Sequence, residues 1–473
     1  MTKFGWLGIA LSLAAAPAAA QPARQHEGMI AELGGAYQGP QAPYVQRIGE
    51  RVAQAAGMRQ RCTFTVVNSE VVNAFTAPPG CYVYVTRGLL ALVNSEAELA
   101  AVLGHELGHV AAKHALRQRN TEALGSLAAV LVGVATRSDV AGQVAGRVAK
   151  LGALGYSRNQ EYEADSLALT YLPAAGYAPE GLTRVLADLQ RESAFAARET
   201  GQSERNAAPW ASTHPLTTDR IRRAAVQAAG APPRVGLTLD ERSYLTALDG
   251  LPYGEDASQG YVRGASYIHP QLGIRFDAPG GSRLTNTPRA VRIVAQDGSL
   301  AEFTGGRVSA GALEAYAMDV LRAAVGNGRA DVGQAQRARI NGLDAVVLPA
   351  RATSAGRAVD VTVVAYSMAS EQAYSFIAVT PAGGAGLFDP MFDSFRRLSD
   401  GDKDVVLGRR IAVTEVRPGD TAESMAARMG PARDGLDRFR MLNALDPGQP
   451  LRPGTRVKLV VEVGAEPRRS LRP

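Results

Sequence analysis

The feature that constrains the fold most is the motif His-Glu-Leu-Gly-His at residues 105–109. Ser95 stands three residues before Glu98, and this capping-box pattern predicts a helix from there to about Leu116. Residues four apart share one helix face, so both imidazoles of the motif can bind one Zn2+. Glu106 follows one residue further round, where its carboxylate is suited to deprotonate the attacking water.

Two histidines leave a catalytic zinc one protein ligand short. Metzincins supply a third histidine six residues after the motif, but that position is Ala115 in this sequence. His114 is one residue out of register, so we expect it behind the ligands or at the surface. The third ligand is therefore expected from another element of the chain.

Carboxylates that could complete the site gather on a later predicted helix. Residues 160–171 have helical spacing and carry Glu161, Glu163 and Asp165. Glu161 and Asp165 share one face of that helix, whereas Glu163 points elsewhere. A metal ligand plus a carboxylate that orients a ligating imidazole fits this pair.

These motifs resemble the gluzincin family of metallopeptidases that includes CAAX prenyl protease 1, HtpX and the periplasmic protease BepA. The second motif, Ser-Arg-x-x-Glu-x-Glu-Ala-Asp, begins at Ser157. Segments at residues 73–75, 85–89 and 96–99 match as well, and the resemblance covers residues 25–226.

The resemblance implies a ligand set and a fold. In that family the first Glu of the second motif is the third zinc ligand, which here is Glu161 beside His105 and His109. One Zn2+ per chain is implied, with Asp165 behind the ligands. The implied fold is a mainly α zincin-type peptidase domain with a small β-sheet.

A histidine further along the chain also matches the family. Residues 212–215 read Ser-Thr-His-Pro, and in family members this histidine approaches the metal site. His214 then has two open roles: it donates to the oxyanion of the tetrahedral intermediate, or it fills the open zinc position as a reversible plug. We expect it at the catalytic site in either case.

Two further features concern the predicted strands. Asn73, Ala74 and Phe75 could form an edge strand beside the zinc helix that binds an extended peptide by strand addition, or a simple hairpin. Cys62 and Cys81 each begin a strand; parallel neighbours would bring them together, whereas an antiparallel hairpin would separate them. A disulfide between them is left open, and the expected compartment permits it.

The first twenty residues have the pattern of a secretory signal peptide. Lys3 is their only charge, apolar residues follow to Leu13, and small residues end the segment at Ala20. We therefore expect a periplasmic protein, with association to the outer membrane left open. The net charge is only +6 and no Lys/Arg block stands out, which argues against a nucleic-acid partner.

A chain of 473 residues is too long for one core and predicts a multidomain protein. We expect the peptidase domain at residues 21–235, a linker at 236–264 and an α+β accessory domain at 265–400. Residues 405–463 resemble a small lysin-motif domain of βααβ order, ahead of a tail at 464–473. Lysin motifs bind the glycan of peptidoglycan or chitin, but a purely structural role is an equal alternative.

The expected function is that of a zinc-dependent endopeptidase of the cell envelope. Protein or peptide substrates are expected, and the family resemblance suggests misfolded or stalled envelope proteins. Outer-membrane or assembly proteins and peptidoglycan are the candidate partners. The alternative is a chaperone-like or peptidoglycan-associated binding protein whose peptidase activity is minor or latched.

Overall fold

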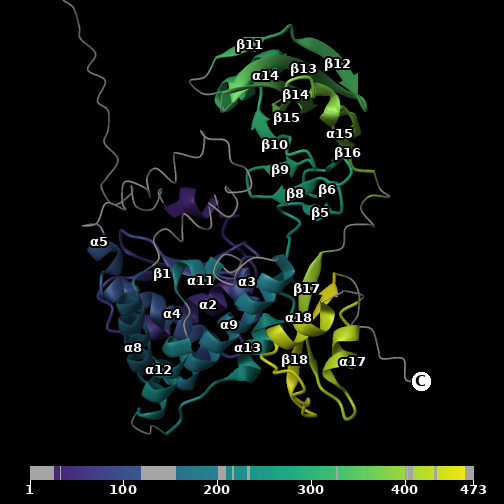
Figure 1. The fold of residues 1–473 in the computed structure, drawn as a ribbon. Helices are drawn as coiled ribbons and strands as arrows, with labels where there is room; N and C mark the ends of the chain where they lie inside the picture. Colours follow the sequence, from purple (N-terminus) through teal and green to yellow (C-terminus); the bar gives the residue numbers. More distant parts are fainter. Residues whose placement is uncertain are drawn as a thin grey trace, which may run out of the picture.

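The computed structural model consists of an N-terminal helical region, a β-rich region and a small C-terminal region (Figure 1). No helix among the described residues is long and apolar enough to cross a membrane. The predicted signal peptide (1–20) and the predicted tail (464–473) lie outside the described part of the chain. The structure describes residues 26–31, 33–118, 156–200, 209–215, 218–231, 235–309, 311–325, 329–354, 356–369, 371–399, 402, 408–430 and 434–463.

The N-terminal region packs a small sheet against a helical core. The sheet order is β1-β3-β2, with β1 parallel to β3 and β2 antiparallel to it at one edge. Alternating β-branched and aromatic residues build β1, whose inward side chains Phe64 and Val66 are buried. The first elements are α2 (Gln41–Ala55), β1 (Cys62–Val67), β2 (Ala74–Thr76), β3 (Cys81–Thr86), α3 (Arg87–Leu92) and α4 (Glu96–Ala111).

The central helix of this region is α4. The Ser95 side chain accepts a hydrogen bond from the backbone of Glu98, which confirms the predicted start. The helix ends at Ala111 rather than near Leu116, because Lys113 adopts a left-handed conformation with φ of 53°. Every side chain from residue 97 to residue 109 is buried, so α4 is enclosed on all sides.

Five of the described helices after α4 enclose it or extend the region. Gly108 of α4 lets α8 approach closely, because a Cβ at that position would lie 3.0 Å from the carbonyl oxygen of Ala164. These helices are α5 (His114–Gln118), α8 (Arg158–Ala174), α9 (Glu180–Thr200), α11 (Pro209–Thr213) and α12 (Thr218–Ala229).

Residues 236–264 are not the linker that we expected. Helix α13 (Glu241–Leu248) buries Tyr244, Leu245 and Leu248 in the same core as α4, and the Tyr244 hydroxyl donates to the carbonyl oxygen of Leu90. Strand β4 (Pro252–Tyr253) pairs with β17 of the C-terminal region, and β5 (Tyr261–Arg263) pairs with β6. The segment is therefore built into three neighbouring units by burial and strand pairing.

The β-rich region contains a large curved sheet with α14 (Leu313–Val325) against β13 and β14 (Figure 1). Its strand order is β11-β13-β14-β15-β10-β9-β8, and β12 also pairs with β13. A smaller sheet has the order β16-β7-β6-β5. The remaining bounds are β6 (Ser266–His269), β7 (Ile274–Asp277), β8 (Arg283–Asn286), β9 (Val291–Val294), β10 (Leu300–Arg307), β11 (Ala330–Val332), β12 (Gln336–Ile340), β13 (Leu343–Ser354), β14 (Arg357–Ala369), β15 (Gln372–Pro381), η2 (Ala385–Phe388), α15 (Asp389–Ser394) and β16 (Arg396–Arg397).

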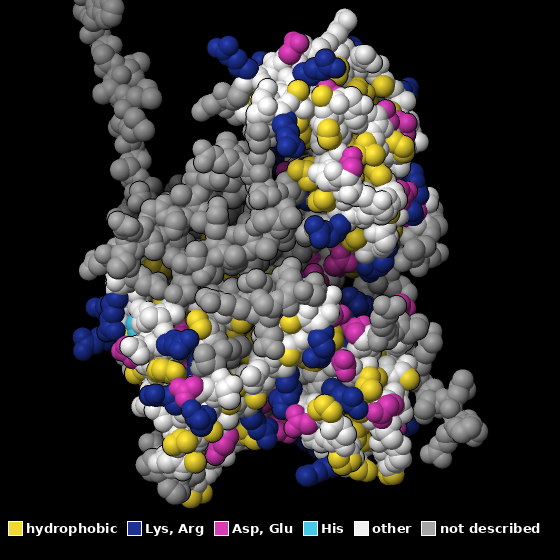
Figure 2. Space-filling view, in the orientation of Figure 1, with side chains coloured by type: hydrophobic (Ala, Val, Ile, Leu, Met, Phe, Trp, Pro, Cys, Tyr) yellow, Lys and Arg dark blue, Asp and Glu magenta, His cyan; other side chains and the backbone are white. Residues whose placement is uncertain are grey.

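The C-terminal region has the order strand, helix, helix, strand: β17 (Arg409–Glu415), α17 (Ala422–Ala427), α18 (Gly435–Leu442) and β18 (Arg456–Glu462). It is docked on the N-terminal region, since Ile411, Leu442 and Val460 belong to the core that contains α4. Lys458 is fully buried, and its ammonium donates to the carbonyl oxygens that end α3. On the face drawn in Figure 2, basic and acidic side chains of the described residues are interspersed.

Candidate metal centre

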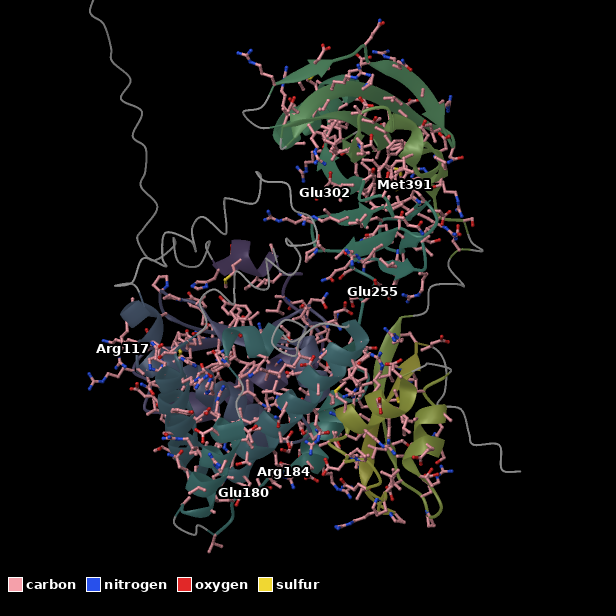
Figure 3. All side chains as sticks on the ribbon, in the orientation of Figure 1. Arg117, Glu180, Arg184, Glu255, Glu302 and Met391 are labelled. Carbon is pink, nitrogen blue, oxygen red and sulfur yellow. A yellow bond between two sulfur atoms is a disulfide. The ribbon has the colours of Figure 1, made fainter. Side chains whose placement is uncertain are left out.

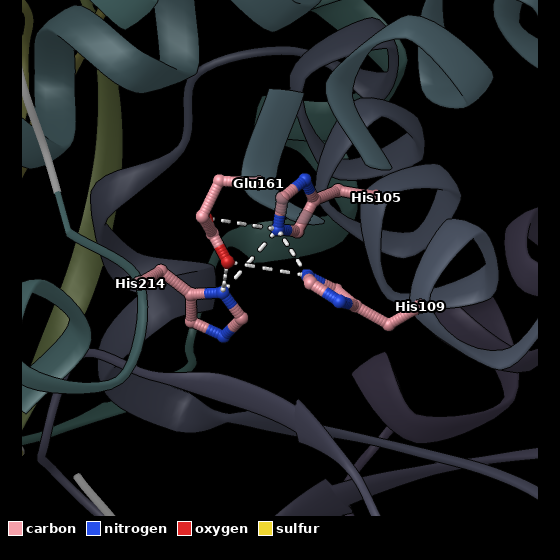
Figure 4. Close-up of side chains that lie close together, drawn as sticks. All are labelled: His105, His109, Glu161 and His214. Carbon is pink, nitrogen blue, oxygen red and sulfur yellow. Dashed lines mark hydrogen bonds and ion pairs between the residues drawn. The ribbon is translucent and has the colours of Figure 1, made fainter. Parts of the chain in front are cut away.

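Two histidines of α4 turn toward one point (Figure 4). His105 Nε2 and His109 Nε2 lie 3.0 Å apart, and the two rings meet at 80°. Their spacing on α4 places them on one helix face, as the sequence predicts. Both side chains are almost fully buried, and so is that of Glu106.

Glu161 reaches the same point from α8. A capping box starts this helix and places Glu161 in its first turn. Its Oε1 lies 3.4 Å from His109 Nε2, and its Oε2 lies 3.6 Å from His105 Nε2. The structure thus brings together the three residues that the family resemblance implies as ligands.

His214 lies in the same cluster, just after α11. Its Nδ1 is 3.3 Å from His105 Nε2 and 3.1 Å from Glu161 Oε1, and its Nε2 is 3.5 Å from Glu106 Oε1. The Trp210 ring stacks on its imidazole with centroids 4.4 Å apart. His214 is therefore near both the predicted ligands and the predicted base, so the geometry accommodates either of its two roles.

The chemistry of this cluster fits a zinc ion. His105, His109, Glu161 and His214 each offer a ligand atom, and these atoms all lie within 4.8 Å of one another. Two imidazole nitrogens and a carboxylate are an established ligand set of catalytic zinc. Within the described part of the chain, neither carboxylate oxygen of Glu106 has a hydrogen-bond partner, although this side chain is fully buried. Its nearest charged contact is His214 at 3.5 Å, so this carboxylate lacks the hydrogen bonds that buried polar groups normally make and could accept one from a bound water.

Burial and nearby charges change the acidity of these groups. Burial raises the pKa of Glu106 above its ordinary value, and His214 and His105 oppose this shift only in part. Burial would lower the pKa of His214, but the carboxylates of Glu161 and Glu106 raise it above the ordinary value. Burial would also raise the pKa of Glu161, yet Arg220 and the histidines hold it well below its usual range.

Behind the cluster, Asp165 contacts the first histidine, as expected. Its Oδ1 lies 2.9 Å from His105 Nδ1. Arg220 of α12 donates from Nε to Asp165 Oδ2 at 2.6 Å, and its Nη1 lies 2.5 Å from Glu161 Oε2. Although burial opposes ionisation, this guanidinium lowers the pKa of Asp165 to about 2. This pairing of Arg220 with two acids was not predicted from the sequence.

His114 lies behind the second histidine and is fully buried, so the surface position is excluded. Its Nδ1 is 2.8 Å from His109 Nδ1, and its Nε2 is 3.1 Å from Glu163 Oε2. Glu163 is directed away from the metal cluster, as the helical spacing indicates, but it reaches the cluster indirectly through His114.

Sequence reasoning missed two aromatic residues at the site. Tyr156 stacks on His109 with ring centroids 3.8 Å apart. Trp210 stacks on His214, as described above. No local pattern marks Tyr156, because its contact with His109 joins segments that are distant in the sequence. Trp210 stands four residues before His214, so its i, i+4 spacing was a local signal that could have been used.

Strand β2 lies at the edge of its sheet and contacts α4. It contains Ala74 and Phe75, whereas Asn73 precedes it and exchanges hydrogen bonds with Thr86. Peptide binding at this edge stays a prediction.

The two cysteines resolve the alternative left open by the sequence. Strands β1 and β3 run parallel with Cys62 opposite Cys81, and a disulfide joins them with a Cα–Cα distance of 4.6 Å. Parallel pairing brings the two strand starts together, which an antiparallel hairpin would not do.

Comparison with known proteins agrees with this geometry. Residues 40–227 match the sequence model of peptidase family M48. A beta-barrel assembly-enhancing protease of Vibrio cholerae is 30% identical over 206 residues, which are 40% of this chain and 40% of that protein. The mitochondrial metalloendopeptidase OMA1 of Schizosaccharomyces pombe is 31% identical over 186 residues, 39% of this chain and 52% of the relative.

Both matches are partial, since the chain spans only 40% and 52% of the lengths of these two relatives. Among solved structures, cyanobacterial PsbP from Synechocystis covers 29% of this chain at 14% identity, with a TM-score of 0.24. That TM-score is too low to assign a fold to the region it covers. The family match coincides with the part of the chain that holds the metal cluster, and residues 40–227 are therefore similar to the metallopeptidases of family M48 in both sequence and candidate metal ligands.

Proposed function

We propose that this protein is a zinc-dependent endopeptidase in which His105, His109 and Glu161 hold one zinc per chain. The observation that carries this proposal is the carboxylate of Glu106, which is buried and has no hydrogen-bond partner among the described residues, beside the converging ligand atoms of His105, His109 and Glu161. A carboxylate that lies beside the ligand atoms and accepts no other hydrogen bond is free to take a proton, as a general base must.

Zinc held by these residues would polarise the scissile carbonyl and lower the pKa of a water molecule. Glu106 would take the proton of the attacking water and pass it to the leaving amine nitrogen. Asp165 would hold His105 in the tautomer that leaves Nε2 free for the metal.

We further propose that an extended peptide binds along the edge of β2. Among the residues that the structure describes, this strand pairs only with β3, and it contacts α4, the helix that carries the motif. Main-chain hydrogen bonds to an edge strand recognise many sequences, because they do not depend on side chains. This mode of binding suits an enzyme whose substrates vary in sequence.

The proposed location is the periplasm, and the proposed substrates are misfolded or stalled envelope proteins. The predicted signal peptide supports the location. The substrate class is supported by relatives named beta-barrel assembly-enhancing protease, in Vibrio cholerae and in Yersinia pestis.

A second candidate is a chaperone-like or peptidoglycan-associated binding protein with a latched peptidase. One observation favours it: His105, His109 and Glu161 are each no more than 2% exposed, and Tyr156 and Trp210 stack on the cluster. A peptide cannot reach ligands that are this deeply buried without movement of the covering groups. The two candidates differ in whether a Glu106→Gln variant can replace the wild-type protein in cells that lack it. Failure of the variant to restore the wild-type phenotype supports the peptidase, whereas full restoration supports the binding protein.

The biochemical test is reversible removal of metal. The full chain should cleave casein, lose that activity when a chelator removes the metal, and regain it when zinc is returned. Cleavage that persists in the fully stripped protein would contradict the proposal.

A further inference from the structure

The two ligating histidines are supported in different ways. His105 and His109 both direct Nε2 into the metal cluster, so in each ring only Nδ1 is available to a supporting group. His105 Nδ1 meets the carboxylate of Asp165, the usual kind of partner. His109 Nδ1 meets a third imidazole instead, the Nδ1 of His114 at 2.8 Å.

We call His109, His114 and Glu163 the second arm, and Asp165 with Arg220 behind His105 the first arm. The proton positions in the second arm follow from the chemistry of its groups. A metal takes the lone pair of His109 Nε2, so the His109 proton must sit on Nδ1 and be donated. His114 Nδ1 must then accept it, which places the proton of a neutral His114 on Nε2. That Nε2 lies 3.1 Å from Glu163 Oε2, an acceptor that suits it. Each contact in the arm therefore has one donor and one acceptor.

We propose that His114 is a positioning residue for His109 and that Glu163 orients His114 in turn. The proposal rests on the zinc site of the proposed function, and it adds two residues to it. Without the hydrogen bond at Nδ1, the ring of His109 could adopt the other tautomer or turn its Nε2 away from the ligand cluster.

Among the contacts of His109, the hydrogen bond to His114 is the one that fixes the rotation of the imidazole ring. Tyr156 stacks on one face of the imidazole at an interplanar angle of 18°, which limits tilting but not rotation within the ring plane. Lys113 lies two residues after the end of α4, and its left-handed φ of 53° turns the chain so that His114 folds back onto His109. Lys113 thus adopts a backbone conformation that is unfavourable for a residue with a side chain, and this conformation places His114 beside His109.

The two arms differ in the solvent exposure of their outermost residues. Asp165 and Arg220 are buried, whereas the side chains of Glu163 and Arg117 are 45% and 58% exposed. Figure 3 shows Arg117 at the outer side of the N-terminal region. Solvent screens the Glu163 contacts, so we expect Glu163 to contribute less than His114.

Three substitutions in the full chain separate positioning from simple packing. His114→Leu keeps much of the side-chain volume but removes the acceptor. His114→Asn places an amide oxygen where Nδ1 now accepts, so it restores the first link of the arm. His269→Leu removes a buried histidine of the β-rich region and serves as the matched control.

Zinc affinity is measured by competition with a chromogenic chelator, and the Co2+-loaded proteins are compared by their visible absorption spectra. We expect His114→Leu to lose about 10- to 100-fold in zinc affinity and to alter the Co2+ spectrum. His114→Asn should recover most of the affinity, Glu163→Ala should lose less than His114→Leu, and His269→Leu should behave as wild type.

Two results would overturn the proposal. One is unchanged zinc affinity in folded His114→Leu; the other is equal loss in the Asn and Leu variants, since packing alone would explain it. Either result leaves the proposed function standing as long as the wild type binds zinc. A wild-type chain with no zinc site would overturn both proposals together.

Discussion

Replacing Lys458 by Met tests whether the C-terminal region is part of the peptidase fold. Lys458 is fully buried, and its ammonium donates to the carbonyl oxygens of Ala91, Leu92 and Val93 at 2.7, 2.8 and 3.0 Å. These carbonyls end α3, directly before the helix that carries the metal motif. Met fills most of the same volume but can donate no hydrogen bond.

The expected cost follows from these contacts. Hydrogen bonds to a charged group contribute about 1.5–3 kcal/mol each, whereas burying the ammonium costs several kcal/mol in the opposite direction. The substitution also removes the cation that faces Glu98 and Asp188, although Asp188 keeps its ion pair with Arg191 at 2.7 Å. Removing one partner of such a buried set usually costs about 3–5 kcal/mol, and we expect a loss of unfolding free energy in this range.

The fluorescence of Trp210 makes the assay specific. The sequence has two tryptophans, and the other, Trp6, lies in the predicted signal peptide. Trp210 is buried beside His214, so urea unfolding followed by its emission reports on the metallopeptidase domain while the substitution lies in the C-terminal region. Arg456→Met, on the same strand, removes an exposed hydrogen bond to Thr246 and should cost less than about 1 kcal/mol. A wild-type midpoint for Lys458→Met would refute the reasoning.

Three further predictions concern single side chains. Glu161→Ala should abolish tight zinc binding, measured as metal content after dialysis, whereas Glu163→Ala should retain the metal. His214→Ala should raise casein cleavage, because its nitrogen lies within the ligand cluster and would block the open zinc position; a loss of about 100- to 1,000-fold would instead identify it as an oxyanion donor. Burial raises the pKa of Glu192 from 4.5 to about 7. Between these two pH values the native state binds more protons than the unfolded state, so the free energy of unfolding falls by roughly 3 kcal/mol as the pH rises from about 4.5 to about 7. Glu192→Gln should remove this dependence in unfolding curves at pH 4.5 and pH 8, and an unchanged slope would count against it.

The grouping of the candidate ligands was predictable in part because some of its signals are local, whereas the choice of Glu161 as third ligand came from the family resemblance and stays a proposal. The spacing of His105 and His109 places them on one helix face, and the spacing of Glu161 and Asp165 directs both toward the same side of α8. These relations hold within a single helix, whatever the rest of the chain does.

The contacts of the site that join distant elements were not predictable. Arg220 meets Asp165 across the contact of α12 with α8, and Tyr156 meets His109 after a long separation in the sequence. His114 was placed in the right neighbourhood, but its link to Glu163 depends on the left-handed turn at Lys113, which no glycine marks.

The predicted linker failed for a similar reason. Its helix α13 and strand β4 are short, and their burial depends on neighbours far away in the sequence. Lys458 shows the same limit within a strand: residues 457–461 are all buried, because both faces of β18 are covered. Alternation of polar and apolar residues predicts outward-facing positions only where one face of a strand meets solvent.

The central claim is that Glu106 is the general base at a zinc site, and one comparison tests it most directly. Zinc content and casein cleavage are measured on the same preparations of wild type and Glu106→Gln. The account predicts about one zinc per chain in both proteins and a loss of at least about 100-fold in the cleavage rate of the variant, since the base is removed while the ligands remain. Undiminished cleavage by zinc-loaded Glu106→Gln would contradict it.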